Sequence, residues 1–110
     1  MDIRLTRQAR VDLEDIRIFT TQTWGQDQWH RYFAGIVAMF ERATVDQKRG
    51  RPRDALRPRM RSLDYQKHLI FFEPITHSGG AVVILRIVHK RRDIAALSYH
   101  DDPEAWPPNK

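Results

Sequence analysis

The chain has 110 residues, a mass of 13.1 kDa and a net charge of +5, which is the size of one domain with a single hydrophobic core. Hydrophobic residues make up 41% of it and cysteine is absent, which excludes a disordered chain, a disulfide scaffold, a cysteine zinc site and a thiol nucleophile. No apolar run approaches the length that crosses a bilayer, and the first residues lack the pattern of a secretion signal. We therefore expect a cytoplasmic protein without membrane contact.

The positive charge is concentrated in one stretch. Residues 48–61 contain seven Lys or Arg and one acidic residue, whereas residues 1–47 contain six basic and seven acidic residues. Such a local excess indicates an acidic partner, either nucleic acid or an acidic protein surface. We interpret five arginines as partner-binding residues: Arg51, Arg53, Arg57, Arg59 and Arg61. Direct nucleic-acid binding is the less favoured reading, because this stretch has no aromatic side chain on which a base could stack.

The first half of the chain has helical periodicity. After a short strand at residues 3–5, Thr6 is a candidate N-cap for a helix whose inward positions are Ala9, Leu13, Ile16 and Thr20. Gly25, directly after Trp24, suits the left-handed conformation that ends a helix. A second helix begins near residue 26, with inward positions Trp29, Phe33, Ile36, Phe40 and Ala43. The short connection predicts an antiparallel hairpin, in which we expect Trp24 and the other aromatic residues to pack.

The second half has the composition of strands. Residues 46–55 are read as a charged loop and residues 56–65 as a strand on which Arg57, Arg59 and Arg61 share one face, with Pro58 limiting it to an edge. Residues 67–75 and 81–89 are read as two further strands joined by a loop at 76–80. Residues 94–99 fit a helical turn or a short strand.

The order of these elements predicts an α+β fold. An N-terminal strand, an antiparallel helical hairpin and a three-stranded antiparallel meander are expected to form one sheet with the helices on one side. We assign residues 1–100 to a single domain and residues 101–110, which include three prolines, to an irregular C-terminal tail.

The sequence has no pattern typical of a metal or nucleophile site. None of the five histidines has a second ligand at zinc-site spacing, and no serine lies in a Gly-x-Ser-x-Gly turn. Gly79 and Gly80 form too short a pair for a phosphate-binding loop. We expect neither a metal nor a cofactor.

One residue inside an apolar stretch needs a partner. Arg86 lies among the hydrophobic residues of the strand at 81–89, where an unpaired charge is costly. We expect Glu73 or Asp93 to pair with it. His89 and Arg91, which follow, are read as the end of the strand and a local ion pair.

Five pieces of the chain, in order, resemble the ParE branch of the RelE/ParE toxin superfamily from bacterial type II toxin–antitoxin systems. They are an opening strand and helix with A-x-x-D-L-x-x-I, a W-G-x-x-Q helix junction, G-R followed by L-R-x-x-x-R-S, an H-x-I-F-Y-like strand and I-x-R-I-L-H-x-R-x-D. In this chain they correspond to residues 5–16, 24–28, 50–62, 67–72 and 84–93.

This resemblance implies a function and a partner. ParE-like toxins are associated with inhibition of DNA gyrase, and the resemblance implies neutralisation by a ParD-like antitoxin in a hetero-oligomer. In the ParE reading no residue is catalytic, His68 is a hydrogen-bonded structural residue and Tyr99 is a packing residue. RelE-like relatives instead cleave mRNA on the ribosome without a metal. In that alternative reading, the catalytic candidates are Arg59, Arg61, His68, Arg91 and Tyr99.

Overall fold

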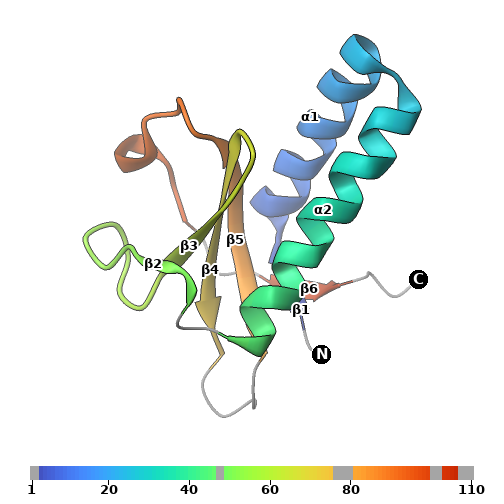
Figure 1. Cartoon of the computed structure of the whole chain (residues 1–110). Helices are drawn as coiled ribbons and strands as arrows, with labels where there is room; N and C mark the ends of the chain where they lie inside the picture. The colour runs from blue at the N-terminus through green and yellow to red at the C-terminus, as the bar shows by residue number, and fades with distance from the viewer. Residues whose placement is uncertain (1–2, 47–48, 76–80, 100–102, 107–110) are drawn as a thin grey trace.

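A computed structural model describes residues 3–46, 49–75 and 81–99, together with the backbone of residues 103–106. Along the chain the elements are β1 (Ile3–Thr6), α1 (Arg7–Trp24), α2 (Gln26–Val45), β2 (Arg51–Pro52), β3 (Arg61–Tyr65), β4 (His68–Pro74), β5 (Val82–His89), the 3-10 helix η2 (Ile94–Ala96) and β6 (Pro103–Trp106). The described strands form one sheet in the order β2-β3-β4-β5-β1-β6. The α1–α2 hairpin stands on one side of this sheet (Figure 1). The α+β class predicted from the sequence is confirmed.

The pairing of the strands places β1 in the interior of the sheet. β1 runs parallel to β5, while β3, β4 and β5 form the expected antiparallel meander. β6 pairs antiparallel with β1 on its other side, from Ile3 opposite Trp106 to Thr6 opposite Pro103. The expectation of an irregular tail is therefore wrong for residues 103–106.

Two residues set the ends of the first helix as predicted. The Thr6 hydroxyl accepts a hydrogen bond from the Ala9 N–H at 3.0 Å, and it donates to the Leu85 carbonyl oxygen at 2.8 Å. Thr6 therefore caps α1 and also fastens it to β5. Gly25 separates the helices with a φ of +93°, a conformation that a side chain would strain. Trp24 is not packed in the hairpin as expected: as the last residue of α1 it is 69% exposed.

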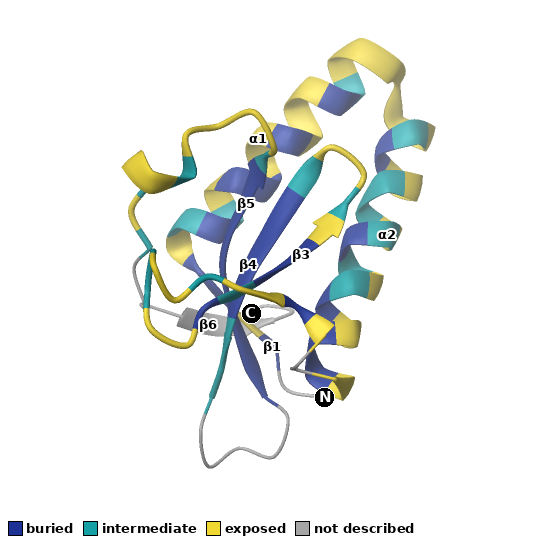
Figure 2. Ribbon diagram, turned by 60° about the vertical axis from the view of Figure 1, so that its left-hand side comes forward, coloured by how far each residue is buried: buried dark blue, intermediate teal, exposed yellow. Residues whose placement is uncertain are grey.

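The sheet is covered on both faces, as the dark strands in Figure 2 show. One cluster of buried side chains joins both helices to one face and includes Leu5, Ile36, Phe40 and Ile84. A second cluster on Met60, Phe71 and Leu85 packs against partly buried residues of the loop before β3 and of the segment after β5. The strand β5 is buried along nearly its whole length, which explains its uninterrupted apolar sequence.

A bulge changes the direction of side chains in β5. Phe71 is opposite Arg86 whereas Phe72 is opposite Ile84, so Leu85 is an extra residue on β5. Before the bulge Ile84 faces the helices, and after it Ile87 does. The alternation of side chains between the two faces of β5 is therefore interrupted next to Arg86.

The segment read as a strand at 56–65 is shorter than predicted. β3 begins only at Arg61, and residues 53–60 form turns, with the Leu56 N–H donating to the Arg53 carbonyl oxygen and Arg59 in the left-handed region at φ +66°. Arg57, Arg59 and Arg61 therefore do not share one strand face. A two-residue strand, β2, pairs with the start of β3 instead. The predicted loop at 76–80 lies outside the described residues.

Candidate functional site

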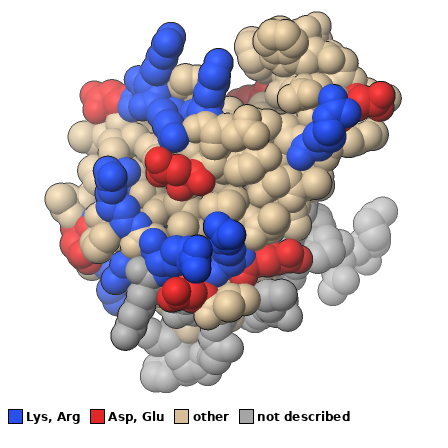
Figure 3. Space-filling model, in the orientation of Figure 1, with Lys and Arg blue, Asp and Glu red and all other residues tan. Residues whose placement is uncertain are grey.

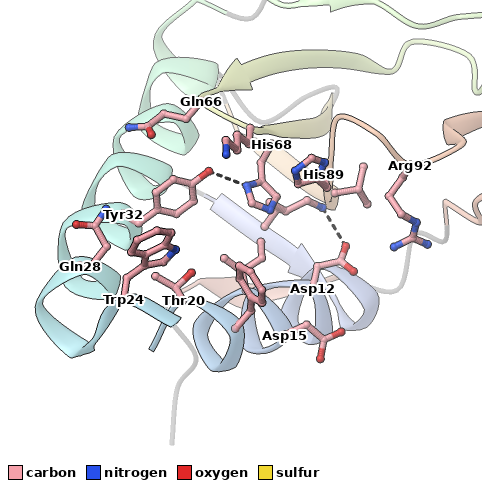
Figure 4. Close-up of a pocket in the computed structure, with 15 residues that line it drawn as sticks. Asp12, Asp15, Thr20, Trp24, Gln28, Tyr32, Gln66, His68, His89 and Arg92 are labelled. Atoms are coloured by element: carbon pink, nitrogen blue, oxygen red, sulfur yellow. Dashed lines mark hydrogen bonds between the residues drawn. The ribbon is translucent and has the colours of Figure 1, made fainter. Parts of the chain in front are cut away.

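A cavity of about 590 Å³ lies between the helical hairpin and one end of the sheet. Its walls come from the second half of α1, the start of α2, the β3–β4 turn and the end of β5 (Figure 4). The volume is within the range of sites that bind small ligands or anchoring side chains of proteins. The sequence did not point to this cavity, because its walls come from four separate stretches of the chain.

The base of the cavity holds two histidines and a tyrosine. The Tyr32 hydroxyl oxygen and His68 Nδ1 are hydrogen-bonded at 2.6 Å, and these side chains point toward one another in Figure 4. The rings of His68 and His89 meet edge to face, with centroids 5.6 Å apart. Burial, followed by the charge of His89, lowers the pKa of His68 to about 4. His68 is therefore neutral at pH 7 and joins α2 to the sheet, which confirms its reading as a hydrogen-bonded residue.

A buried ion pair lies beside the cavity. Arg86 Nε donates to Asp12 Oδ2 at 2.8 Å and a second guanidinium nitrogen donates to Oδ1 at 3.1 Å, with both side chains 7% exposed. Asp12 Oδ2 also accepts from the Ile87 N–H at 2.9 Å, and Arg86 donates to the Ser98 carbonyl oxygen at 3.1 Å. The network connects α1, β5 and the segment after β5.

This ion pair corrects the expected partner of Arg86. Neither Glu73 nor Asp93 pairs with it: Glu73 accepts from two arginines of the loop before β3, and Asp93 accepts from the Ala95 N–H. The signal that sequence reasoning overlooked is the position of Asp12, which shares the inward face of α1 with Ala9, Leu13 and Ile16. A carboxylate on the buried face of α1 is costly unless a cation pairs with it, and the sheet supplies that cation as Arg86.

The rim of the cavity is aromatic and exposed. Phe19 is 64% exposed and Trp24 is 69% exposed, and both line the cavity from α1. On the opposite side, Lys67 and Arg92 line it from the ends of the sheet. The cavity therefore combines an apolar edge on the helix with basic groups on the sheet.

The arginines predicted to bind a partner are largely engaged within the molecule. We call these residues the arginine loop: Arg51, Arg53, Arg57, Arg59 and Arg61. Arg57 and Arg59 both bind the Glu73 carboxylate, at 2.8 and 3.2 Å. Arg53 donates to the Ser62 hydroxyl at 2.9 Å and Arg61 to the Gly50 carbonyl oxygen at 2.7 Å. Arg51 is exposed, and Arg59 keeps 60% of its side chain exposed.

A second group of basic residues gathers at the other end of the sheet. We call it the turn cluster: Lys67, Lys90, Arg91 and Arg92, all exposed. The Lys90 N–H donates to the Lys67 carbonyl oxygen at 2.9 Å, which holds the two turns together. Lys90 forms an ion pair with Asp64 at 3.3 Å, whereas no described acidic residue pairs with Lys67, Arg91 or Arg92. In Figure 3 basic side chains gather at the top, where β5 ends, and again below, around β2.

The five residues of the catalytic alternative do not form one group. Arg59 binds Glu73, which lies five residues along β4 from His68. In an extended strand this separation puts Glu73 about 17 Å from His68. Tyr99 packs its ring on Phe71, in the second cluster, and donates its hydroxyl to the Ile94 carbonyl oxygen at 2.8 Å.

The remaining two catalytic candidates are also separate from each other. Arg61 is bound to Gly50, and Arg91 is exposed in the turn cluster, where its N–H donates to His89 Nδ1. Instead of the local ion pair expected for His89 and Arg91, the Arg91 backbone N–H donates a hydrogen bond to the His89 ring.

The part of the chain that the structure describes contains neither a candidate metal site nor a helix that could span a membrane. No group of three or more His, Asp or Glu residues there could hold a metal ion. Neither described helix has the length and apolar character needed to span a membrane.

Known proteins resemble this chain over most of its length. The family described as the ParE toxin of the type II toxin-antitoxin system, parDE, matches residues 3–94. Toxin ParE1 of Mycobacterium tuberculosis (strain CDC 1551 / Oshkosh) is 30% identical over 90 residues, covering 82% of this chain and 90% of the relative. Toxin ParE1 of Caulobacter vibrioides is 30% identical over 93 residues, 84% of this chain and 93% of its own.

A solved structure shares the fold. A chain of the "Chromosomal ParDE TA system from P. aeruginosa" superposes with a TM-score of 0.65 at 23% identity, covering 81% of this chain and 95% of that one. The Asp12–Arg86 pair also joins two of the sequence pieces by which the chain resembles this family. The chain belongs to the ParE toxin family of type II toxin–antitoxin systems.

Proposed function

We propose that this chain acts in the cytoplasm as a toxin that inhibits DNA gyrase by binding it, and that a ParD-like antitoxin neutralises it in a hetero-oligomer. The observation that carries the proposal is the family match over residues 3–94, which includes the whole of α1, α2 and the meander. A single fold can host both binding and catalysis, so the arrangement of the residues has to distinguish them.

The placement of the catalytic candidates supports binding over RNA cleavage. Metal-free cleavage of RNA needs a base, an acid and a charge-stabilising group around one phosphate. Here His68 lies against Tyr32 on the helix side of the sheet, whereas Tyr99 packs against Phe71 in the other cluster. The Tyr99 hydroxyl is already hydrogen-bonded to a carbonyl oxygen. These groups have structural partners and do not surround a common point.

The arginine loop supports a role in attracting the antitoxin. Arg51 and Arg59 extend into solvent, and we propose that their charge adds to the long-range attraction of an acidic antitoxin. Arg53, Arg57 and Arg61 chiefly hold the loop in place through Ser62, Glu73 and Gly50.

Two reactions with the purified protein test the proposal. Gyrase supercoiling is measured in one, and cleavage of ribosome-bound mRNA in the other, each with the wild type and with Tyr99→Phe. We expect the wild type to inhibit supercoiling and to leave the mRNA intact, and Tyr99→Phe to inhibit gyrase equally. Cut mRNA, with cutting lost in Tyr99→Phe, would replace the proposal by the endonuclease reading.

A further inference from the structure

We propose that the turn cluster contacts the phosphate backbone of the DNA duplex that gyrase holds, so that the toxin binds the enzyme and its DNA together. This inference deepens the proposed function and rests on it. The toxin alone should also bind duplex DNA weakly and without sequence preference, because phosphate contacts carry no sequence information.

The side chains of the turn cluster face solvent at the end of the sheet. Basic side chains gather at the top of Figure 3, where β5 ends. Lys67, Arg91 and Arg92 are exposed, and no described acidic residue pairs with any of them. In the arginine loop, by contrast, the Glu73 carboxylate binds two of the five guanidinium groups. The turn cluster therefore offers an approaching anion more exposed positive charge without an acidic partner than the arginine loop does.

Two exposed carboxylates lie next to the turn cluster, and each has a partner of its own. Asp64 pairs with Lys90 at 3.3 Å, and Asp93 accepts a hydrogen bond from the Ala95 N–H at 3.2 Å. These carboxylates weaken the attraction of an anion to Lys90. They leave the other three cations of the cluster without a counter-charge among the described residues.

The residue types of the two turns favour nucleic acid over an acidic protein. Residues 66–67 and 90–92 include no apolar side chain. Protein interfaces are depleted in Lys and are held by apolar and aromatic contacts, whereas surfaces that bind DNA are polar and strongly positive. The enzyme that we propose as the target acts on DNA, so a duplex lies close to a toxin bound to it.

The two turns lie side by side, and backbone hydrogen bonds hold them. At this end of β4 and β5, His68 is opposite His89, and beyond this pair the Lys90 N–H donates to the Lys67 carbonyl oxygen at 2.9 Å. The Arg92 N–H donates to the His89 carbonyl oxygen at 3.0 Å. Neighbouring strands are about 5 Å apart, and phosphates follow one another every ~3.4 Å of helix axis along one DNA strand. The cations of the two turns are therefore spaced to reach nearby phosphates without rearrangement, which lowers the cost of binding.

Binding of the purified protein to a short fluorescein-labelled DNA duplex of mixed sequence, measured by anisotropy over a range of salt concentrations, tests this contact. The variant Lys67→Gln with Arg91→Gln removes one cation from each turn, and Arg51→Gln with Arg59→Gln is the control with the same loss of charge. We expect the turn-cluster variant to raise Kd about 10-fold or more and to lower the slope of log Kd against log salt by about 2. The control should change Kd by less than about 3-fold. Since all four side chains are exposed, the thermal midpoint of both variants should stay near that of the wild type.

Gyrase supercoiling assays with the same proteins connect the contact to the target. We expect the turn-cluster variant to need about 10-fold more protein than the wild type for half inhibition, and the control to inhibit like the wild type. If the wild type inhibits supercoiling and the turn-cluster variant inhibits equally, or binds the duplex equally, the inference is wrong and the proposed function stands. If that variant keeps its DNA affinity but binds DNA-free gyrase more weakly, the cluster contacts protein and the inference is wrong as well. If the wild type does not inhibit supercoiling, the proposed function fails and the inference fails with it.

Discussion

Removal of the Asp12 carboxylate should be among the most damaging single changes in this fold. Asp12 binds two guanidinium nitrogens of Arg86 and also accepts from the Ile87 N–H. In Asp12→Ala the guanidinium keeps the Ser98 carbonyl oxygen but has lost its counter-charge, and the Ile87 N–H has lost its acceptor. Both groups would remain buried, since Arg86 is 6% exposed in the native structure.

The size of the effect follows from burial. Breaking a buried ion pair by deleting one partner costs about 3–5 kcal/mol, because the remaining charge is uncompensated. The whole free energy of unfolding of a small domain is about 5–15 kcal/mol. We therefore expect Asp12→Ala to lower the free energy of unfolding by about 3–5 kcal/mol, enough to bring the protein close to unfolding.

Urea unfolding of five proteins tests this prediction: the wild type, Asp12→Ala, Asp12→Leu, Arg86→Met and the double variant Asp12→Leu with Arg86→Met. The double variant buries no charge, so we expect it to be more stable than Asp12→Leu by about 2 kcal/mol. If the effects of the two single changes simply add, or if Asp12→Leu costs less than about 1 kcal/mol, the carboxylate and guanidinium are not coupled as the structure indicates.

Three further changes have expected outcomes. Thr6→Ala should lower the free energy of unfolding in urea by about 1–2 kcal/mol, because it removes the cap of α1 and the hydrogen bond to the Leu85 carbonyl oxygen. Thr6→Ser keeps the hydroxyl and should therefore retain most of this stability. Because the pKa of His68 is lowered from 6.5 to about 4, the unfolded chain binds more protons, so stability should fall as pH drops from 6.5 towards 4. His68→Gln should flatten that slope, and an unchanged slope would contradict the assignment. Gly35→Ala should destabilise despite the helix preference of alanine, because its Cβ would lie 1.8 Å from the Tyr65 hydroxyl oxygen, and adding Tyr65→Ala should remove the clash.

Local signals in the sequence predicted the local structure well. Thr6 caps α1 and Gly25 separates the helices because each acts on residues within one turn of itself. The 3.6-residue period of Trp29, Ile36 and Phe40 identified the buried face of α2 for the same reason. Where tertiary contacts decide, the sequence was less informative: Pro58 and Arg59 turn the chain, and β3 starts later than its composition indicated.

The partner of Arg86 shows why the interior of the site could not be predicted. Asp12 is 74 residues away, and the nearer carboxylates Glu73 and Asp93 looked equally suitable. The bulge at Leu85 redirects β5, and a strict alternation of side chains does not reveal such a bulge. The cavity has the same origin, because Trp24, Tyr32, Lys67 and Arg92 meet only after the hairpin has folded onto the sheet.

The arginine loop and the turn cluster show that the charge counted along the sequence differs from the charge exposed on the folded surface. The excess at residues 48–61 is the largest in the chain, yet Glu73 alone neutralises part of it through Arg57 and Arg59. Lys67 and Lys90 are 23 residues apart in the sequence, but one backbone hydrogen bond brings their turns together. The turn cluster borders exposed aromatic residues, whereas the arginine loop contains none. Charge directs the approach of a partner and buried apolar contacts hold it, so a surface that offers both is the better candidate for the tight interface.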